Sequence, residues 1–129
     1  MQLHLLPGMF AICRLNARDA LPQWALANRG FVSITRTEDE LSIICPESAL
    51  PAGVTSENGW RILKVAGPLD FALTGVVSSI AAPLADAGIS IFAISTYDTD
   101  YVLVRDANRT AAVQVLLAEG HLLEPAAGL

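Results

Sequence analysis

The chain has 129 residues, of which 53% are hydrophobic and 16% are charged, and its formal net charge at pH 7 is −5. This length is enough for one compact domain or for two very small units that share a sheet. Residues 1–58 hold four basic and six acidic groups, residues 59–129 hold four and seven, and the basic residues are scattered singly. Binding to a nucleic acid is therefore not expected, because that function needs clustered Lys and Arg.

The apolar composition also bears on assembly and location. The first seven residues lack the basic flank and long apolar run of a signal peptide, and no stretch offers the ~20 uninterrupted apolar residues of a membrane span. We therefore expect a cytoplasmic protein with no membrane association, in which Cys13 and Cys45 are reduced and buried. Such a high apolar fraction in a short chain predicts a homodimer that covers the remaining apolar surface.

The first half of the chain predicts a short α/β unit. Alternating and β-branched apolar runs indicate strands, and residues 21–27 fit a short helix with Pro22 in its first turn. Only a trace of a second helix fits around Glu47 to Leu50, and the Gly- and Pro-rich residues 51–59 are typical of a linker. The expected strands cover residues 10–15, 31–35 and 41–45.

The next elements are a strand over residues 60–66 and a helix that begins near Thr74. The strand alternates with period two and stops at Gly67-Pro68, and the helix follows from apolar spacing, with Thr74 or Asp70 as its N-cap. Pro83 falls inside the helical pattern, so we expect a kink or a restart there. Gly88 ends the helix.

The last elements are a hairpin, a helix and an edge strand. The strands of the hairpin cover residues 89–95 and 101–104, and Asp106 is expected to cap the final helix. That helix is expected to bury a stripe of Ala107, Ala111, Val115 and Leu117 or Ala118. Residues 121–124 are short enough for an edge strand.

From residue 60 to residue 124 the predicted order is β-α-β-β-α-β. This is the ferredoxin-like unit, an α+β fold with a four-stranded antiparallel sheet and both helices on one face. The first half repeats this order in truncated form, which favours an internal duplication. We divide the chain into a truncated unit, residues 1–58, and a complete one, residues 59–129. The core of the complete unit is expected to include Val76, Ile80, Leu84, Ile91, Ala93, Val102 and Val104.

Several segments of the chain resemble a known family. The strongest are residues 67–75 and 91–101, joined by the helix-to-strand passage 83–91, with looser likeness at residues 3–8 and 35–42. They are similar to small bacterial proteins built of two ACT domains, related to the regulatory ACT pairs of aspartate kinases. Residues 94–100 also look similar to animal cytosolic arginine sensors, which share this fold.

The resemblance implies a regulatory sensor that binds an amino acid or a similar small ligand. The family places the ligand between the loop after the first strand, the start of the first helix and the end of the second strand, here residues 68–77 and 94–100. Many ACT domains begin that loop with Asp-x-Pro-Gly, whereas here Gly67-Pro68 precedes Asp70. The expected ligand-binding residues are Asp70, Thr74, Gly75, Val76, Val77, Ile94, Ser95, Thr96, Asp98 and Asp100.

Physical chemistry is compatible with this site but leaves other roles open. A helix N-terminus with unpaired N–H groups suits a carboxylate, and aspartates suit an amino or guanidinium group. Asp98 and Asp100 also suit a tight hairpin turn, and Asp70 a helix cap. Gly75 could serve helix–sheet packing, and the two valines could belong to the core.

Catalysis is not expected. The sequence has no Gly-rich phosphate loop of recognised spacing, no nucleophile elbow and no Cys/His cluster at metal-ligand spacing, so we expect no cofactor and no metal. The alternative from another class is a structural dimerisation module that acts by protein–protein contact and binds no ligand.

Overall fold

The computed structural model describes residues 1–70 and 72–124 and divides the chain into two compact units. The first unit is Gly8–Trp60, and the second consists of Met1–Pro7 together with Arg61–Leu129. Phe71 and residues 125–129, which end the expected complete domain, lie outside the described residues. Within the described part of the chain, no helix is long and apolar enough to cross a membrane.

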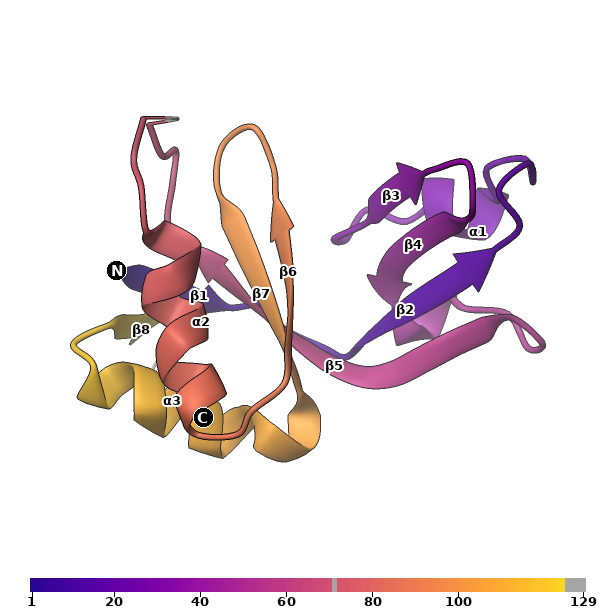
Figure 1. The fold of residues 1–129 in the computed structure, drawn as a ribbon. Helices are drawn as coiled ribbons and strands as arrows, with labels where there is room; N and C mark the ends of the chain where they lie inside the picture. The colour runs from indigo at the N-terminus through magenta and orange to yellow at the C-terminus, as the bar shows by residue number, and fades with distance from the viewer. Residues whose placement is uncertain (71, 125–129) are drawn as a thin grey trace. The chain divides into compact units, whose positions relative to one another are not determined.

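The first unit is a small sheet with very little helix (Figure 1). Its strands follow the order β3-β4-β2-β5, all antiparallel, and a 3₁₀ turn, η1, stands where only a trace of a second helix was expected. The predicted linker is wrong after residue 54, because Thr55 already begins a long strand. The elements are β2 Phe10–Leu15, α1 Gln23–Leu26, β3 Ser33–Arg36, β4 Leu41–Pro46, η1 Glu47–Ala49 and the beginning of β5 Thr55–Val65.

The second unit has the predicted β-α-β-β-α-β order. Strands β6 and β7 form an antiparallel hairpin with Ala93 opposite Val102, and β7 also pairs with β5. The end of β5 is the first strand of this unit, so the same strand belongs to both units. The remaining elements are α2 Val76–Asp86, β6 Ile91–Ser95, β7 Asp100–Arg105, η2 Asp106–Asn108, α3 Arg109–Ala118 and β8 Leu122–Glu124.

One strand of the second unit comes from the start of the chain. Strand β1, Gln2–Leu5, pairs antiparallel with β5, with Leu3 opposite Val65, and parallel with β8, with Leu3 opposite Leu123. The expected four-stranded antiparallel sheet is therefore wrong in this respect. The sheet of this unit has the order β6-β7-β5-β1-β8 and contains one parallel pair.

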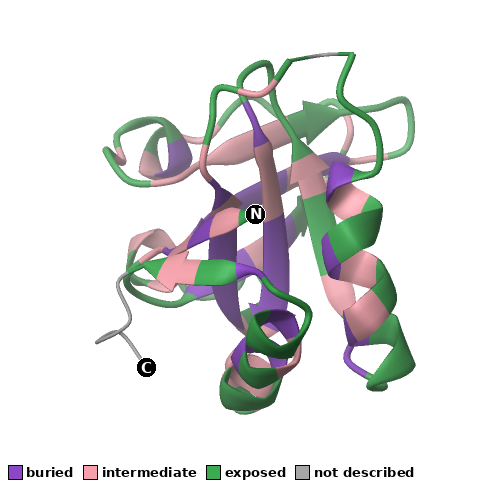
Figure 2. Ribbon diagram, turned by 90° about the vertical axis from the view of Figure 1, so that its left-hand side faces the viewer, coloured by how far each residue is buried: buried purple, intermediate pink, exposed green. Residues whose placement is uncertain are grey.

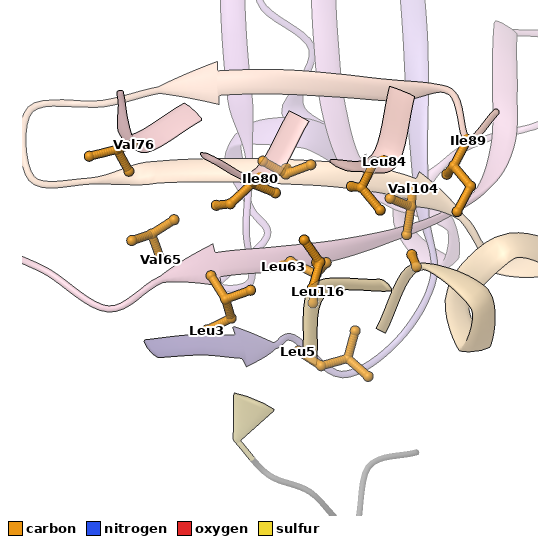
Figure 3. Close-up of a cluster of buried hydrophobic side chains, with 12 residues drawn as sticks. Leu3, Leu5, Leu63, Val65, Val76, Ile80, Leu84, Ile89, Val104 and Leu116 are labelled. Atoms are coloured by element: carbon orange, nitrogen blue, oxygen red, sulfur yellow. The ribbon is translucent and has the colours of Figure 1, made fainter. Parts of the chain in front are cut away.

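The core of the second unit lies between its sheet and both helices (Figure 3). Val76, Ile80 and Leu84 from α2 and Leu116 from α3 pack against sheet residues such as Val65. This arrangement confirms that both helices cover the same face. The predicted core residues are buried, apart from the partly buried Ile91 and the exposed Ala93.

Ala93 is exposed because β6 is an edge strand. Its burial pattern has no fully buried residue, whereas three consecutive residues of β7 are buried (Figure 2). Among the described residues β6 pairs only with β7. The inclusion of Ala93 in the core was therefore wrong, since alternation places a residue on a face but does not say how far that face is covered.

Helix α2 begins later than predicted, and it does not restart at Pro83. It begins at Val76, with Gly75 as the N-cap residue and no capping side chain, so neither Thr74 nor Asp70 caps it. The helix continues through Pro83 to Asp86 without the expected restart. The buried apolar residues before and after Pro83, namely Val76, Ile80 and Leu84, therefore lie on one continuous helix.

Helix α3 is rotated relative to its predicted stripe. Its buried residues are Ala112, Val113 and Leu116, none of which belongs to the expected set, while the expected Val115 is partly buried against the core. Alanine, valine and leucine occur all round this helix, so spacing alone does not fix which face is buried. Asp106 does not cap it: its carboxylate lies 3.3 Å from the Arg61 guanidinium.

Candidate functional site

A groove of about 440 Å³ lies in the second unit, between the start of α2 and the β6–β7 hairpin. Figure 1 shows the loop before α2 and the hairpin tip at the same end of this unit. The groove is lined by Leu69, Asp70, Leu73, Gly75, Val76, Val77, Ser78, Ser95, Thr96, Tyr97, Asp98, Thr99 and Asp100.

The hairpin turn that forms one wall is closed by two threonines. The Thr96 N–H and hydroxyl both donate to the Thr99 carbonyl, at 2.9 and 3.0 Å, and the Thr99 N–H lies 3.4 Å from the Thr96 hydroxyl. Hydroxyl groups suit such local bonds to the backbone. These bonds close the turn without a carboxylate.

The loop from β5 to α2 is held against this turn. Leu69 N donates to the Asp98 carbonyl at 2.7 Å, and the Thr99 hydroxyl donates to the Val65 carbonyl at 2.6 Å. A Cβ on Gly67 would lie 2.9 Å from the Thr99 Cβ and 3.0 Å from the Asp98 carbonyl oxygen. Only glycine therefore permits this approach of the loop and the turn.

The helical wall presents an open N-terminus. Gly75 has φ +76°, a conformation that residues with a Cβ rarely adopt, and a Cβ there would approach nothing closer than Ser78 Oγ at 3.8 Å. Gly75 thus serves the backbone conformation and not the close packing also considered for it. The first bond of the helix runs from Ser79 N to Gly75 O at 2.9 Å, which leaves the N–H groups of Val76, Val77 and Ser78 without an acceptor inside the helix.

Three aspartates give the groove its charge. Asp70 Oδ1 accepts from Ala72 N at 2.9 Å, which forms a local turn before the helix. Asp100 Oδ1 accepts from Ser95 Oγ at 2.5 Å across the β6–β7 pair. Asp98 is exposed on the outer turn. Among the described residues that line the groove none is basic.

The structure brings together every expected ligand-binding residue except Thr74 and Ile94. Thr74 lies before Gly75, the N-cap residue of α2, because the helix begins later than predicted. Ile94 precedes Ser95 on β6, and successive side chains of a strand point to opposite faces. Leu69, Leu73, Ser78, Tyr97 and Thr99 also line the groove but were not singled out as ligand-binding residues, although all except Ser78 lie within the expected ranges 68–77 and 94–100. The Thr96-x-x-Thr99 spacing was the sequence signal for the last of these.

The cysteines lie elsewhere, in the buried core of the first unit. Burial and, to a smaller extent, the neighbouring Cys45 raise the pKa of the Cys13 thiol to about 12. Burial also raises the pKa of the Cys45 thiol. Thiols of this kind are poor nucleophiles. Within residues 1–70 and 72–124, no group of three or more His, Cys, Asp or Glu residues is placed to hold a metal ion.

Comparison with known proteins identifies the family and the fold of the chain. Residues 55–118 match the family model of the ACT domain, and residues 8–53 match a second family model described as an N-terminal domain. The chain belongs to the ACT-domain family. Its expected ferredoxin-like ACT fold is thereby confirmed.

Two solved structures and one curated protein are similar to this chain. The crystal structure of protein Atu0741 from Agobacterium tumefaciens is 44% identical, with a TM-score of 0.89 over 95% of this chain and 90% of that one. The regulatory subunit of aspartate kinase from Thermus thermophilus, 15% identical, shares the ACT fold with a TM-score of 0.62 over 91% of this chain and 96% of that one. The cytosolic arginine sensor for mTORC1 subunit 1 from Bos taurus is 30% identical over 69% of this chain. The ACT chain spans 30% of that sensor's length.

Proposed function

We propose that this ACT protein is a non-catalytic regulatory sensor that binds an amino acid in the groove of its second unit. The observation that carries the proposal is the pairing of an uncapped helix N-terminus with three aspartates around one groove. An α-amino acid offers the matching charges, a carboxylate and an ammonium group on one carbon.

The two walls of the groove suit opposite ends of such a ligand. N–H groups at the start of α2, together with the partial positive charge of the helix, favour the carboxylate. Asp100, half-buried and oriented by Ser95, favours the cationic end through a charge-assisted hydrogen bond. Because the lining residues include three aspartates and no basic group, we propose a neutral or basic amino acid, with arginine first.

Relatives support a regulatory role in the cytoplasm. Curated relatives from Bos taurus and Homo sapiens are named cytosolic arginine sensors for mTORC1, and one structural neighbour is a regulatory subunit. We therefore propose that this chain, too, is cytoplasmic and reports amino-acid availability to a partner. The expected duplication, with a truncated unit before a complete ACT domain, remains part of this proposal.

The test is a thermal-shift screen of the purified protein against the twenty amino acids. A ligand that binds only the native state raises Tm, and the rise grows with concentration. L-arginine is expected to give a shift and L-aspartate none, because the groove already holds three carboxylates. If none of the twenty raises Tm, the ligand-free dimerisation module becomes the better description.

Self-association belongs to the same proposal. Strand β6 is an edge that exposes Phe92 and Ala93, and exposed apolar edges are rarely left uncovered. We propose a two-fold dimer through this edge. Light scattering at tens of micromolar is expected to give twice the chain mass of 13.7 kDa, and a strict monomer would contradict the dimer.

A further inference from the structure

The carbonyl oxygen of Ser79, in the first turn of α2, lacks a donor from its own helix. In an uninterrupted helix this oxygen would accept from the N–H four residues later, but that residue is Pro83, which has no N–H. His121 supplies the missing donor: its Nε2 lies 3.0 Å from the Ser79 oxygen. Since a carbonyl oxygen can only accept, Nε2 carries the proton in this bond.

His121 is connected to two other parts of the second unit, the end of α3 and the start of the chain. Its backbone N donates to Leu116 O at 3.1 Å, at the end of α3, and its Nδ1 lies 3.1 Å from the Met1 nitrogen. The next residue, Leu122, donates from its N–H to Met1 O at 2.9 Å, where β8 pairs with β1. Only 6% of His121 is exposed. One buried side chain therefore links α2 to the β1–β8 edge.

Ser79 stands directly beside the groove. Its N–H makes the first bond of α2, to Gly75 O, and both Gly75 and Ser78 line the groove. The N–H groups proposed to receive the ligand belong to this same turn. Whatever holds the Ser79 carbonyl in place therefore also holds that wall of the groove.

We infer that His121 is a positioning residue that fastens the first turn of α2 to strand β8, so that docking of β8 beside β1 and ligand binding in the groove stabilise each other. The fastening itself rests on the geometry alone. The link to a ligand rests on the proposed function.

The fastening is tested without ligand by a double-mutant cycle. His121→Ala removes the donor, and Pro83→Ala restores a helical N–H that can reach the Ser79 oxygen. We expect His121→Ala to lower the urea midpoint more in the native background than in the Pro83→Ala background, because the second donor takes over the carbonyl. Equal losses in both backgrounds would overturn the inference.

A conservative variant separates the hydrogen bond from simple packing. His121→Gln places an amide N–H close to the position of Nε2, so it is expected to keep the native hydrogen-exchange rates of the Ser79 and Ile80 N–H groups. His121→Ala is expected to speed exchange at Ser79 and Ile80 several-fold, with the β6–β7 pairing unchanged. If His121→Gln speeds exchange as much as His121→Ala, or if exchange rises uniformly over the second unit, the positioning role is wrong.

The link to the groove is tested by titration with L-arginine. His121→Ala is expected to weaken binding about two- to tenfold, the scale of one hydrogen bond, while His121→Gln stays close to the native affinity. If His121→Ala binds L-arginine as tightly as the native protein, the link is wrong even where the cycle shows coupling. If the native protein binds no L-arginine, that ligand assignment fails, and the cycle alone decides the positioning role.

Discussion

The hydroxyl group of Thr99 donates a 2.6 Å hydrogen bond to the carbonyl of Val65, and thereby joins the hairpin turn beside the groove to the end of β5. Thr99 is 4% exposed, so its hydroxyl has little access to water. We expect Thr99→Val, which keeps the shape and removes the donor, to lower the free energy of unfolding by about 1–3 kcal/mol. Urea denaturation measures this loss. Thr99→Ser keeps the hydroxyl and is the matched control, and an equal loss in both variants would show that packing dominates.

Gly67 allows the loop to lie against the same turn. Gly67→Ala would place a Cβ 2.9 Å from the Thr99 Cβ, so we expect a destabilisation of about 1–3 kcal/mol from overpacking. Gly30→Ala is the control, because its Cβ would meet neighbours only at 3.4 Å. Thermal unfolding of both variants makes the comparison, and similar Tm values would contradict the close approach.

The β6–β7 pair offers a matched test of the core. Val102 is fully buried, whereas Ala93, directly opposite in the register, is exposed. Val102→Asp is expected to unfold the second unit, because an unpaired buried charge costs several kcal/mol. Ala93→Asp should leave the circular dichroism spectrum folded. A folded Val102→Asp protein would show that the helix face of the sheet is not closed.

The thiol of Cys13 predicts a loss of stability in alkali. Burial raises its pKa from 9.0 to about 12, so above pH 9 the unfolded chain releases this proton more readily than the folded one. The contribution of this thiol to the free energy of unfolding is fully present below pH 9 and is lost as the pH rises towards 12. Urea midpoints at pH 7.5 and pH 10 are expected to differ less in Cys13→Ala than in the native protein. An equal drop in both proteins would assign the effect to other groups.

Asp100 is the residue to change in the groove. Asp100→Asn keeps the shape and an oxygen that can accept from Ser95, but removes the charge proposed to meet the ligand's cationic end. The affinity for L-arginine is expected to fall by about ten- to a hundredfold, the scale of about 1.5–3 kcal/mol, with Tm without ligand little changed. Asp98→Asn, on the outer turn, should lower the affinity for L-arginine less. Calorimetric titration measures both, and unchanged binding by Asp100→Asn would refute its assignment.

The elements of the second unit are predictable because their signals are local. Period-two alternation in residues 60–66 and helical spacing from Val76 to Leu84 each identify an element within about ten residues. The start of α2 was misplaced because Gly75 takes a positive φ, which sequence alone does not announce. The buried face of α3 was misplaced because apolar residues occur on every side of this helix.

Contacts between distant segments were not predictable in this way. Strand β1 has only four residues, and its partners lie about 60 and 120 positions away in the sequence. His121 looked like a plain edge-strand residue, since its partner in α2 is a carbonyl made available by a proline. The family resemblance supplied the two walls of the groove, residues 68–77 and 94–100, while Ser78 lies outside these ranges and joined the groove only through the fold.

The path of the chain through its two units also determines the order in which they can be completed during synthesis. The first unit, Gly8–Trp60, lies entirely between β1 and the rest of the second unit, so all its strands have left the ribosome early and it can close at once. Strand β1 is made before the first unit, yet its parallel partner β8 is made some 120 residues later. Leu3 and Leu5 share one core with Leu116 of α3, so this core can be completed only after nearly all of the second unit has been synthesised.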